Sequence, residues 1–415
     1  MGLSRIQLLS RGAQDVHLTG TPRVSLFRTV YHRHTNFALE TVEQIFDQQP
    51  TWGSTSSATL TRQGDLVQSM FLRVTAPQLY VPPSSPQPVF LRYCNSFCHA
   101  LVRSCQLKIG GQTVNTVPGS WMEVQDELTN SEVKRKGYGH AIGKQYLANG
   151  KPDDYHLSDE QVSYENHMGS KRAVTFFLPV RFYMRSAELS IPIVSLKHQE
   201  VTVHFEFRDI LELVNWRWAE SSSMNSGDVP AFVRDDVTIE MFATFVYLDT
   251  DEQRFVAEKR HEFLIEQIQH AGYLTTNQAS SFRLPFRHPV KELVWTVSRP
   301  GRNVHFDYGE HEGVERVVSA QLRMNGRNVL PSLHPKFYRT LMPYKRHTRV
   351  PSRHIYSHCF SLEPEATYPT GSLNFSRFAV VTLDLTLAEG TEIDVYAVSY
   401  NVLRIMNGTA SVGFA

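Results

Sequence analysis

The stretch Gln106-Leu-Lys-Ile-Gly-Gly-Gln-Thr-Val114 recurs in the second half of the chain as Gln321-Leu-Arg-Met-Asn-Gly-Arg-Asn-Val329. In both stretches a Gly-Gly or Asn-Gly pair separates two short runs in which apolar and polar residues alternate. Such pairs favour the tight turns with positive φ that join the strands of a β-hairpin. The repeated hairpin predicts that the chain contains two copies of one β-rich unit.

Further strand-like segments follow the hairpin in the same order in both halves. The corresponding pairs are residues 177–179 and 360–364, 201–207 and 381–387, and 239–245 and 393–399. Apolar and polar residues alternate in most of these segments, which indicates half-buried antiparallel strands. Only residues 121–128 and 251–259 suggest short helices. We therefore predict an all-β protein built as two tandem sandwiches or jelly rolls.

The number of residues that separates each segment from its counterpart decreases along the chain. This decrease indicates that the first copy carries insertions. We place these insertions near residues 130–172 and 216–230 and interpret them as loops in a common β framework. The predicted organisation is an arm of residues 1–24, a first domain of residues 25–250, a linker of residues 251–260 and a second domain of residues 261–415.

Composition excludes several classes of protein. The 415 residues include 42 Lys and Arg against 41 Asp and Glu, for a net charge of +1, so the chain is not a strongly basic nucleic-acid coat. Four cysteines are too few for a disulfide scaffold, which favours a reducing compartment. No apolar run approaches the roughly 18 residues that a membrane span needs.

Three groups of residues resemble metal ligands, but none has the spacing of a known site. The groups are His32, His34 and Glu40; His261, Glu262, Glu266 and His270; and Cys94, Cys98, His99 and Cys105. The first departs from the spacing of cupin enzymes, the second is not His-Glu-x-x-His, and the third contains no Cys-x-x-Cys pair. No nucleophile elbow, Walker loop or dinucleotide fingerprint is present. We expect no catalytic residues, no cofactor and no metal.

Basic residues gather between His334 and His354, interleaved with Phe337, Tyr338 and Tyr344. This mixture of positive charge and aromatic rings could contact phosphates and stack on bases. Because the net charge of the chain is close to zero, we favour a subunit contact or a solvated loop over nucleic-acid binding.

Several blocks of the sequence resemble one protein family. They include Phe27-Arg-Thr-Val-Tyr-His-Arg-His-Thr-Asn-Phe-Ala-Leu-Glu40, Arg62-Gln-Gly-Asp-Leu66 and Tyr400-Asn-Val-Leu-Arg-Ile-Met406. Further blocks lie at residues 12–20, 109–112, 189–200, 245–250, 261–267 and 374–377. In this order, which covers nearly the whole chain, they resemble the major capsid proteins of nucleocytoplasmic large DNA viruses, of the chlorovirus type.

The resemblance implies a fold of two consecutive eight-stranded antiparallel jelly rolls with short helices in the loops. It implies a structural protein of the virion, assembled in the host cytoplasm, whose homotrimer forms a pseudo-hexagonal capsomer of an icosahedral shell. The implied partners are neighbouring capsomers, minor capsid and penton proteins and, through the N-terminal arm, the side of the internal membrane, but not nucleic acid. By motif match, the positions expected to determine fold and assembly are Tyr31, Arg33, His34, Asn36, Gly64 and Asp65.

Three alternatives remain open at this point. A minor or penton-type capsid protein would share the fold but would not dominate the virion mass. A bicupin metalloenzyme would hold a stoichiometric metal, with His32, His34 and Glu40 as its first candidate ligands. A carbohydrate-binding sandwich would bind glycans as an isolated monomer.

Overall fold

The computed structural model describes residues 12–21, 34–88, 90–144, 173–218, 228–298, 305–309, 315–388 and 391–414. The chain forms two compact units, residues 1–37 and 38–415. In the first unit, α2 (Ala13–Thr19) begins after Gly12, whose amide donates a hydrogen bond of 2.8 Å to the Asp15 carboxylate. None of the described helices is long and apolar enough to cross a membrane.

Two antiparallel sheets form the first barrel. One has the strand order β1-β11-β3-β7, with the short β8 also paired to β3, and the other has the order β2-β9-β5-β6. Their strands are β1 (Phe37–Gln44), β2 (Thr55–Thr59), β3 (Leu66–Ala76), β5 (Val102–Ile109), β6 (Gln112–Pro118), β7 (Val174–Val180), β8 (Ile191–Pro192), β9 (Val201–Phe207) and β11 (Thr238–Leu248).

The second barrel repeats this plan. Its sheets have the orders β12-β20-β14-β17 and β13-β19-β15-β16, with β18 paired to β14 and β21 paired to β20. Its strands are β12 (His261–Thr275), β13 (Ala279–Arg283), β14 (Pro289–Ser298), β15 (Val317–Met324), β16 (Arg327–Asn328), β17 (Ile355–Cys359), β18 (Leu373–Asn374), β19 (Val381–Leu387), β20 (Thr391–Met406) and β21 (Thr409–Val412).

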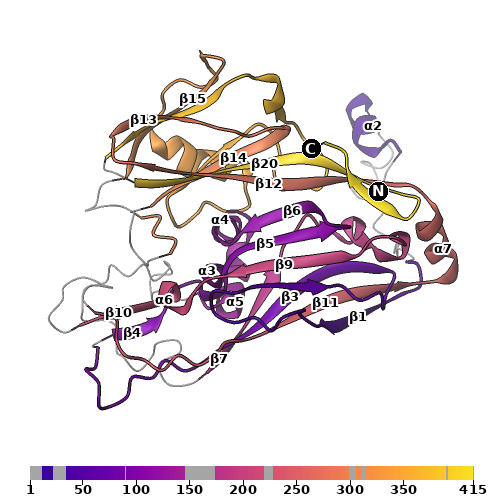
Figure 1. Ribbon diagram of the computed structural model, residues 1–415. Helices are drawn as coiled ribbons and strands as arrows, with labels where there is room; N and C mark the ends of the chain where they lie inside the picture. Colours follow the sequence, from indigo (N-terminus) through magenta and orange to yellow (C-terminus); the bar gives the residue numbers. More distant parts are fainter. Residues whose placement is uncertain are drawn as a thin grey trace, which may run out of the picture. The chain divides into compact units, whose positions relative to one another are not determined.

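The strand orders of the two barrels are equivalent, strand for strand. In each barrel, the two sheets face one another and form a jelly roll (Figure 1). The repeated sequence forms the β5–β6 hairpin in the first barrel and the β15–β16 hairpin in the second. Both turn residues have positive φ in each hairpin, 56° and 81° at Gly110 and Gly111, and 49° and 78° at Asn325 and Gly326. The predicted double jelly roll is therefore confirmed, together with the hairpins that indicated it.

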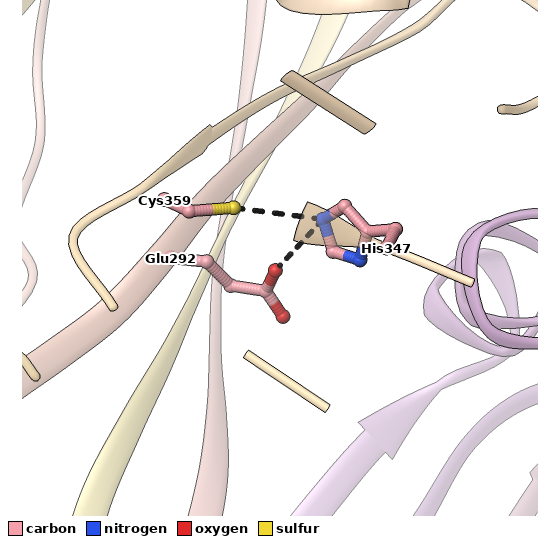
Figure 2. A group of neighbouring side chains, drawn as sticks. All are labelled: Glu292, His347 and Cys359. Carbon is pink, nitrogen blue, oxygen red and sulfur yellow. Dashed lines mark hydrogen bonds and ion pairs between the residues drawn. The ribbon is translucent and has the colours of Figure 1, made fainter. Parts of the chain in front are cut away.

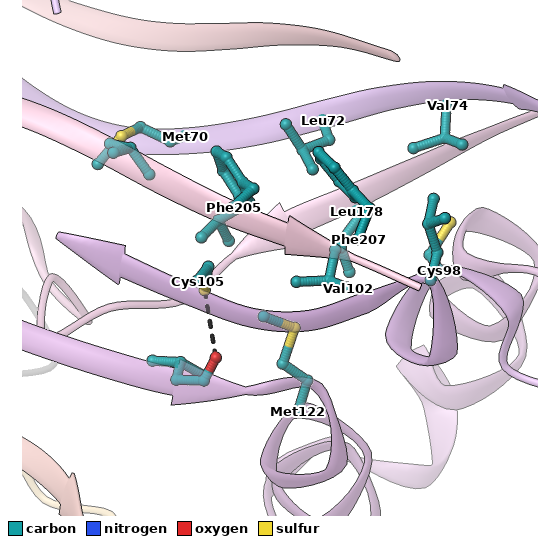
Figure 3. Close-up of a cluster of buried hydrophobic side chains, with 14 of the residues drawn as sticks. Met70, Leu72, Val74, Cys98, Val102, Cys105, Met122, Leu178, Phe205 and Phe207 are labelled. Carbon is teal, nitrogen blue, oxygen red and sulfur yellow. Dashed lines mark hydrogen bonds between the residues drawn. The ribbon is translucent and has the colours of Figure 1, made fainter. Parts of the chain in front are cut away.

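Alternating burial explains why these segments are strands. In β9 and β19, every second residue is buried, from one end of the strand to the other. Figure 3 shows side chains of β3 (Met70, Leu72 and Val74) packed with Phe205 and Phe207 of β9 between the two sheets of the first barrel. Each barrel thus buries one face of each sheet in its own core.

The helices lie in the connections between strands. They are α3 (Phe97–Leu101), α4 (Gly119–Thr129), α5 (Glu132–Ile142), α6 (Ile210–Leu213), α7 (Thr250–Glu258) and α8 (Met342–Arg346). Single helical turns are η2 (Ala187–Leu189), η3 (Ile193–Ser195), η4 (Phe337–Leu341) and η5 (Phe375–Arg377). The two segments in which the sequence suggested helices correspond to α4 and α7.

The two segments interpreted as insertions fall only partly among the described residues. Residues 145–172 and 219–227 lie outside them. Within the first segment the chain forms α5, and the second begins in β10 (Val214–Arg217), which pairs with β4 (Phe90–Tyr93) in a separate two-stranded ribbon. Neither described portion belongs to the two main sheets of the first barrel.

Candidate functional site at the junction of the two barrels

The core of the first barrel continues into the outer face of the β12-β20-β14-β17 sheet. Val294, Tyr396 and Val398 of that sheet belong to the same buried cluster as the first core. Trp121 of α4 packs on Tyr396 with ring centroids 5.3 Å apart. In Figure 1, β6 of the first barrel accordingly lies next to β12 of the second. The two barrels are joined by a continuous apolar contact.

A buried acidic face of α4 is the most highly charged part of this junction. Glu123, Asp126 and Glu127 lie three and four residues apart, so their carboxylates share one side of the helix. All three side chains are at most 1 % exposed. Three buried like charges would strongly destabilise the fold unless cations were held between them.

Lys144 supplies the first of these cations. Its Nζ lies 2.7 Å from Glu123, 2.8 Å from Asp126 and 2.7 Å from Glu127, and its side chain is fully buried. Gly143 ends α5 with a left-handed φ of 78°, and the Lys144 amide then donates to the Gly139 carbonyl at 2.7 Å. This glycine turn directs the lysine toward α4.

The second barrel supplies two more cations. Nη2 of Arg349 lies 2.8 Å from Oε2 of Glu127, and Nη1 of Arg353 lies 3.9 Å from Oε1 of Glu123. The amide and hydroxyl of Ser352 donate hydrogen bonds of 3.0 and 2.8 Å to Glu127. These contacts join residues more than 200 positions apart and bind one barrel to the other through ion pairs and charge-assisted hydrogen bonds.

Two arginines of the basic stretch between residues 334 and 354 thus serve a contact within the chain, whereas Lys336, Tyr344 and Lys345 of the same stretch are exposed. Arg349 and Arg353 are buried, and Arg339 pairs with Glu315 at 3.5 Å. The expectation of a solvated loop was wrong for Arg349 and Arg353, because sequence alone does not reveal the acidic face that neutralises them.

The same contacts set the ionisation of the acidic face. Burial by itself raises the pKa of Glu127, but Lys144 and Arg349 outweigh it and lower that pKa to about 2. Burial also opposes ionisation of Glu123, whose pKa is nevertheless held well below its usual range by Lys144 and by a hydrogen bond from His99. Glu123 and Glu127 therefore act as permanent anions of the junction at neutral pH.

Acid is expected to weaken this junction. The unfolded pKa of a glutamate is about 4.3, so the contribution of Glu127 is complete above that pH and is lost as the pH falls toward 2. The loss is on the order of 3 kcal/mol. Urea unfolding between pH 7 and pH 2.5 should show a shallower acid decline for Glu127→Gln than for the wild type.

The matched control for that titration is Glu132→Gln, because Glu132 lies on α5 with its side chain 70 % exposed. This variant should follow the wild-type pH profile. An unchanged acid decline in Glu127→Gln would contradict the assigned role of Glu127.

Asp65, one of the expected fold and assembly positions, links three elements of the first barrel. Its carboxylate accepts hydrogen bonds of 2.8 Å from the Leu248 amide at the end of β11 and of 2.7 Å from Gln253 in α7. Its own carbonyl accepts from the Val194 amide in η3 at 3.1 Å. This geometry fits a residue that fixes the start of β3.

The other expected positions lie in different surroundings. Gly64 faces Phe245 of β11, and a Cβ atom built on it would lie 2.7 Å from Cβ of Phe245. His34 is exposed, and its Nδ1 lies 2.7 Å from the Thr35 carbonyl oxygen. Asn36 is also exposed, whereas Tyr31 and Arg33 lie outside the described residues.

Those metal candidates of the sequence that lie among the described residues form no metal-ligand group. His32 lies outside the described residues, and Glu40 accepts a hydrogen bond of 2.8 Å from the Tyr247 hydroxyl. On β12, His270 pairs with Asp394 at 2.7 Å, while Glu266 pairs with Arg185 at 2.8 Å and with Lys291.

The three clustered cysteines belong to the apolar core. Cys94, Cys98 and Cys105 are buried free thiols, and burial raises the pKa of each, to about 12 for Cys94. The Cys105 thiol donates a hydrogen bond to the Val117 carbonyl at 3.5 Å, and the neighbouring His99 contacts Glu123 instead. Burial and a raised pKa are typical of structural cysteines.

Among the described residues, two groups have the composition and spacing of metal ligands, and the sequence indicated neither. One is the acidic face of α4, where the Lys144 ammonium takes the place that a metal ion would occupy. The other consists of Glu292, His347 and Cys359 in the second barrel.

An aromatic cluster covers part of the outer face of the first barrel. Phe71 of β3 stacks on Phe242 of β11 at 5.2 Å and contacts Phe177 of β7 at 6.2 Å. The Arg73 guanidinium lies 5.2 Å from the centre of the Phe242 ring. Phe177 is 45 % exposed, so the cluster presents apolar surface to solvent.

Comparison with known proteins gives matches along the whole chain. Residues 25–249 match the family of the major capsid protein N-terminus, and residues 252–411 match the family of the large eukaryotic DNA virus major capsid protein. The major capsid protein of Pyramimonas orientalis virus is 31 % identical over 445 residues, covering 100 % of both chains. That of Phaeocystis pouchetii virus is 27 % identical, covering 99 % of both.

A solved structure shares the fold. The chain in the quasi-atomic model of the PBCV-1 virus capsid superposes with a TM-score of 0.76 at 23 % identity, covering 94 % of this chain and 100 % of that one.

Proposed function

The chain belongs to the family of major capsid proteins of large eukaryotic DNA viruses, and on that premise we propose that three copies of it form one capsomer of the virion shell. Its function is structural, and its place is the capsid. We further propose that it has no catalytic role and that it acts through the contacts that its surfaces make.

The observation that carries this proposal is the pairing of two equivalent barrels through a buried junction. Both barrels have the same strand order, and the buried ion pairs between α4 and residues Arg349 and Arg353 hold them together in one compact unit. Three such chains around a threefold axis supply six similar barrels, which approximates the sixfold outline of a hexagonal tile. A flexible tether between the barrels would not define such a tile.

The test of this function is the native mass of the purified full-length chain, measured by light scattering. We expect a particle of three times 47.4 kDa. In purified virions, the chain should account for most of the protein mass. A minor or penton-type protein would be scarce in the virion, and a glycan-binding monomer would bind sugars without forming trimers. Either result would overturn the proposal.

We propose that the aromatic cluster of Phe71, Phe177 and Phe242 contacts a neighbouring copy of the chain in the trimer. Aromatic side chains beside an arginine are typical of the residues that dominate binding energy at protein interfaces. The double variant Phe71→Ser/Phe242→Ser should lower the trimer fraction at least tenfold at a fixed protein concentration, as measured by analytical ultracentrifugation.

The matched control is Leu274→Ser, which removes an apolar side chain that is 68 % exposed on β12 in the second barrel. It should leave the trimer fraction unchanged. A double variant that trimerises like the wild type would remove this face from the proposed interface while leaving the capsid function untouched.

The remaining assembly roles rest on family membership. We propose that residues 1–24 form an arm that reaches minor capsid proteins, penton proteins or the membrane side of the shell. We also propose that Tyr31, Arg33, His34, Asn36, Gly64 and Asp65 determine fold and assembly. For Gly64 and Asp65 the support is their close contact with β11, α7 and η3.

A further inference from the structure

Three potential metal ligands meet on the outer face of the second barrel. Glu292 of β14 and Cys359 of β17 are direct cross-strand partners, and His347 follows the last residue of α8 (Figure 2). Nε2 of His347 lies 3.6 Å from Sγ of Cys359 and 3.3 Å from Oε2 of Glu292. Two paired strands and the end of a helix therefore hold a carboxylate, an imidazole and a thiol in one place.

The polar groups of this cluster are poorly satisfied by one another. Oε2 of Glu292 is buried and accepts no hydrogen bond from the described residues. On the far side of the His347 ring, Nδ1 lies 3.2 Å from Oε1 of Glu365. A neutral imidazole donates through only one nitrogen, so one of the two carboxylates faces a lone pair. A buried arrangement of this kind is costly unless a cation joins it.

The two distances from Nε2 of His347, to Sγ of Cys359 and to Oε2 of Glu292, fit a tetrahedral zinc ion, and all three ligand atoms lie within 4.8 Å of one another. Zinc bonds of about 2.3 Å to sulfur and about 2.0–2.2 Å to nitrogen and oxygen put tetrahedral ligands about 3.5 Å (sulfur to nitrogen) and about 3.3 Å (nitrogen to oxygen) apart. The observed distances are 3.6 and 3.3 Å. Sulfur and nitrogen ligands select zinc over magnesium and calcium, which prefer oxygen.

We propose that Glu292, His347 and Cys359 form a zinc site, with the fourth position open to water. Zinc takes the thiolate of Cys359, so binding releases the thiol proton to solvent, and the two anionic ligands balance the charge of the ion. Glu365 accepts the Nδ1 proton of His347 and so presents Nε2 to the metal, as carboxylates behind zinc-bound histidines commonly do.

The position of the site gives it a structural role. His347 is two residues before Arg349, which pairs with Glu127 of the first barrel. A zinc ion would anchor this segment to β14 and β17, and would thereby hold Arg349 and Arg353 at the junction. This inference does not depend on the capsid function.

The test uses the full-length protein, stripped of metal under reducing conditions and titrated with Co²⁺, which replaces zinc and reports its ligands by colour. We expect one Co²⁺ per chain, with the sulfur-to-cobalt charge-transfer band and the visible bands of tetrahedral cobalt, and displacement of the ion by Zn²⁺. Zn²⁺ should also raise the melting temperature, because it binds the folded chain preferentially.

Cys359→Ser should abolish the charge-transfer band although the three core cysteines remain, and His347→Gln should lower Co²⁺ affinity at least a hundredfold. Glu365→Gln should lower it about 10- to 100-fold. His140→Gln, an exposed histidine on α5, is the matched control and should bind as the wild type does. Circular dichroism of each variant without metal establishes that it is folded.

Two results would overturn the proposal. One is a folded wild-type chain that takes up no Co²⁺ or Zn²⁺ at micromolar concentrations. The other is a charge-transfer band that persists in Cys359→Ser, because it would place the bound metal on another cysteine. In either case Glu292, His347 and Cys359 would be a cluster of packed polar side chains without a metal.

Discussion

Replacing Lys144 with methionine is expected to lower the free energy of unfolding at pH 7 by at least about 3–5 kcal/mol, which is the usual cost of removing one partner from a buried ion pair. The loss is large because Lys144 has three carboxylate partners, at 2.7, 2.8 and 2.7 Å. A typical domain has only about 5–15 kcal/mol of stability, so this single change should remove a large part of it.

The same variant should weaken the response of stability to acid. In the wild type, cations lower the pKa values of Glu123 and Glu127, so stability falls as the pH decreases toward 2. Without the Lys144 ammonium, burial is opposed only by Arg349, Arg353 and His99, so the pKa values of Glu123 and Glu127 should rise toward their unfolded values. Lys144→Met should therefore lose less stability than the wild type as the pH falls from 7 toward 2.5.

Urea unfolding followed by near-ultraviolet circular dichroism measures both effects. Lys136→Met, at an exposed position on α5, is the matched control and should stay within about 0.5 kcal/mol of the wild type. The double variant Lys144→Met/Glu123→Gln should lose less free energy of unfolding than the sum of the losses of the two single variants. The reason is that the double variant no longer carries the buried charge of Glu123. Strictly additive losses would contradict the proposed coupling.

The sequence predicted the barrels because period-two alternation is a local property. Val201–Phe207 and Val381–Leu387 show it without interruption, and both are strands with those bounds. The turn chemistry of Gly110-Gly111 and Asn325-Gly326 was equally local, since positive φ is costly for other residues. The equivalence of the two barrels followed from the order of such segments.

The junction could not be predicted in the same way, because its energy depends on contacts between distant residues. Glu127 and Arg349 read separately as one charge on a helix and one charge in a basic stretch, and only the fold makes them a buried pair. Glu292, His347 and Cys359 are scattered along the chain, so no ligand spacing revealed them. A lysine such as Lys144, next to a glycine, carries no signal of burial at all.

Gly64→Val is expected to be the most damaging change among the motif positions. A Cβ atom at residue 64 would lie 2.7 Å from Cβ of Phe245 and 3.2 Å from its Cγ and Cδ1. Phe245 is fully buried in β11, and its Cβ moves only with the backbone, so the new side chain must push the start of β3 away from β11. Overpacking of this kind costs about 1–3 kcal/mol, and the second branch of valine adds to it.

The displacement should extend to the neighbouring Asp65, whose carboxylate holds the Leu248 amide and Gln253. We therefore expect Gly64→Ala to lose about 1–3 kcal/mol and Gly64→Val to give little soluble trimer. Gly137→Ala is the matched control: a Cβ there meets no atom within 4 Å, and because alanine favours the helical state of α5 it should gain about 0.5–1 kcal/mol. If Gly64→Ala and Gly137→Ala had similar melting temperatures, β3 and β11 would tolerate a side chain at this contact. Packing would then not explain why residue 64 is a glycine.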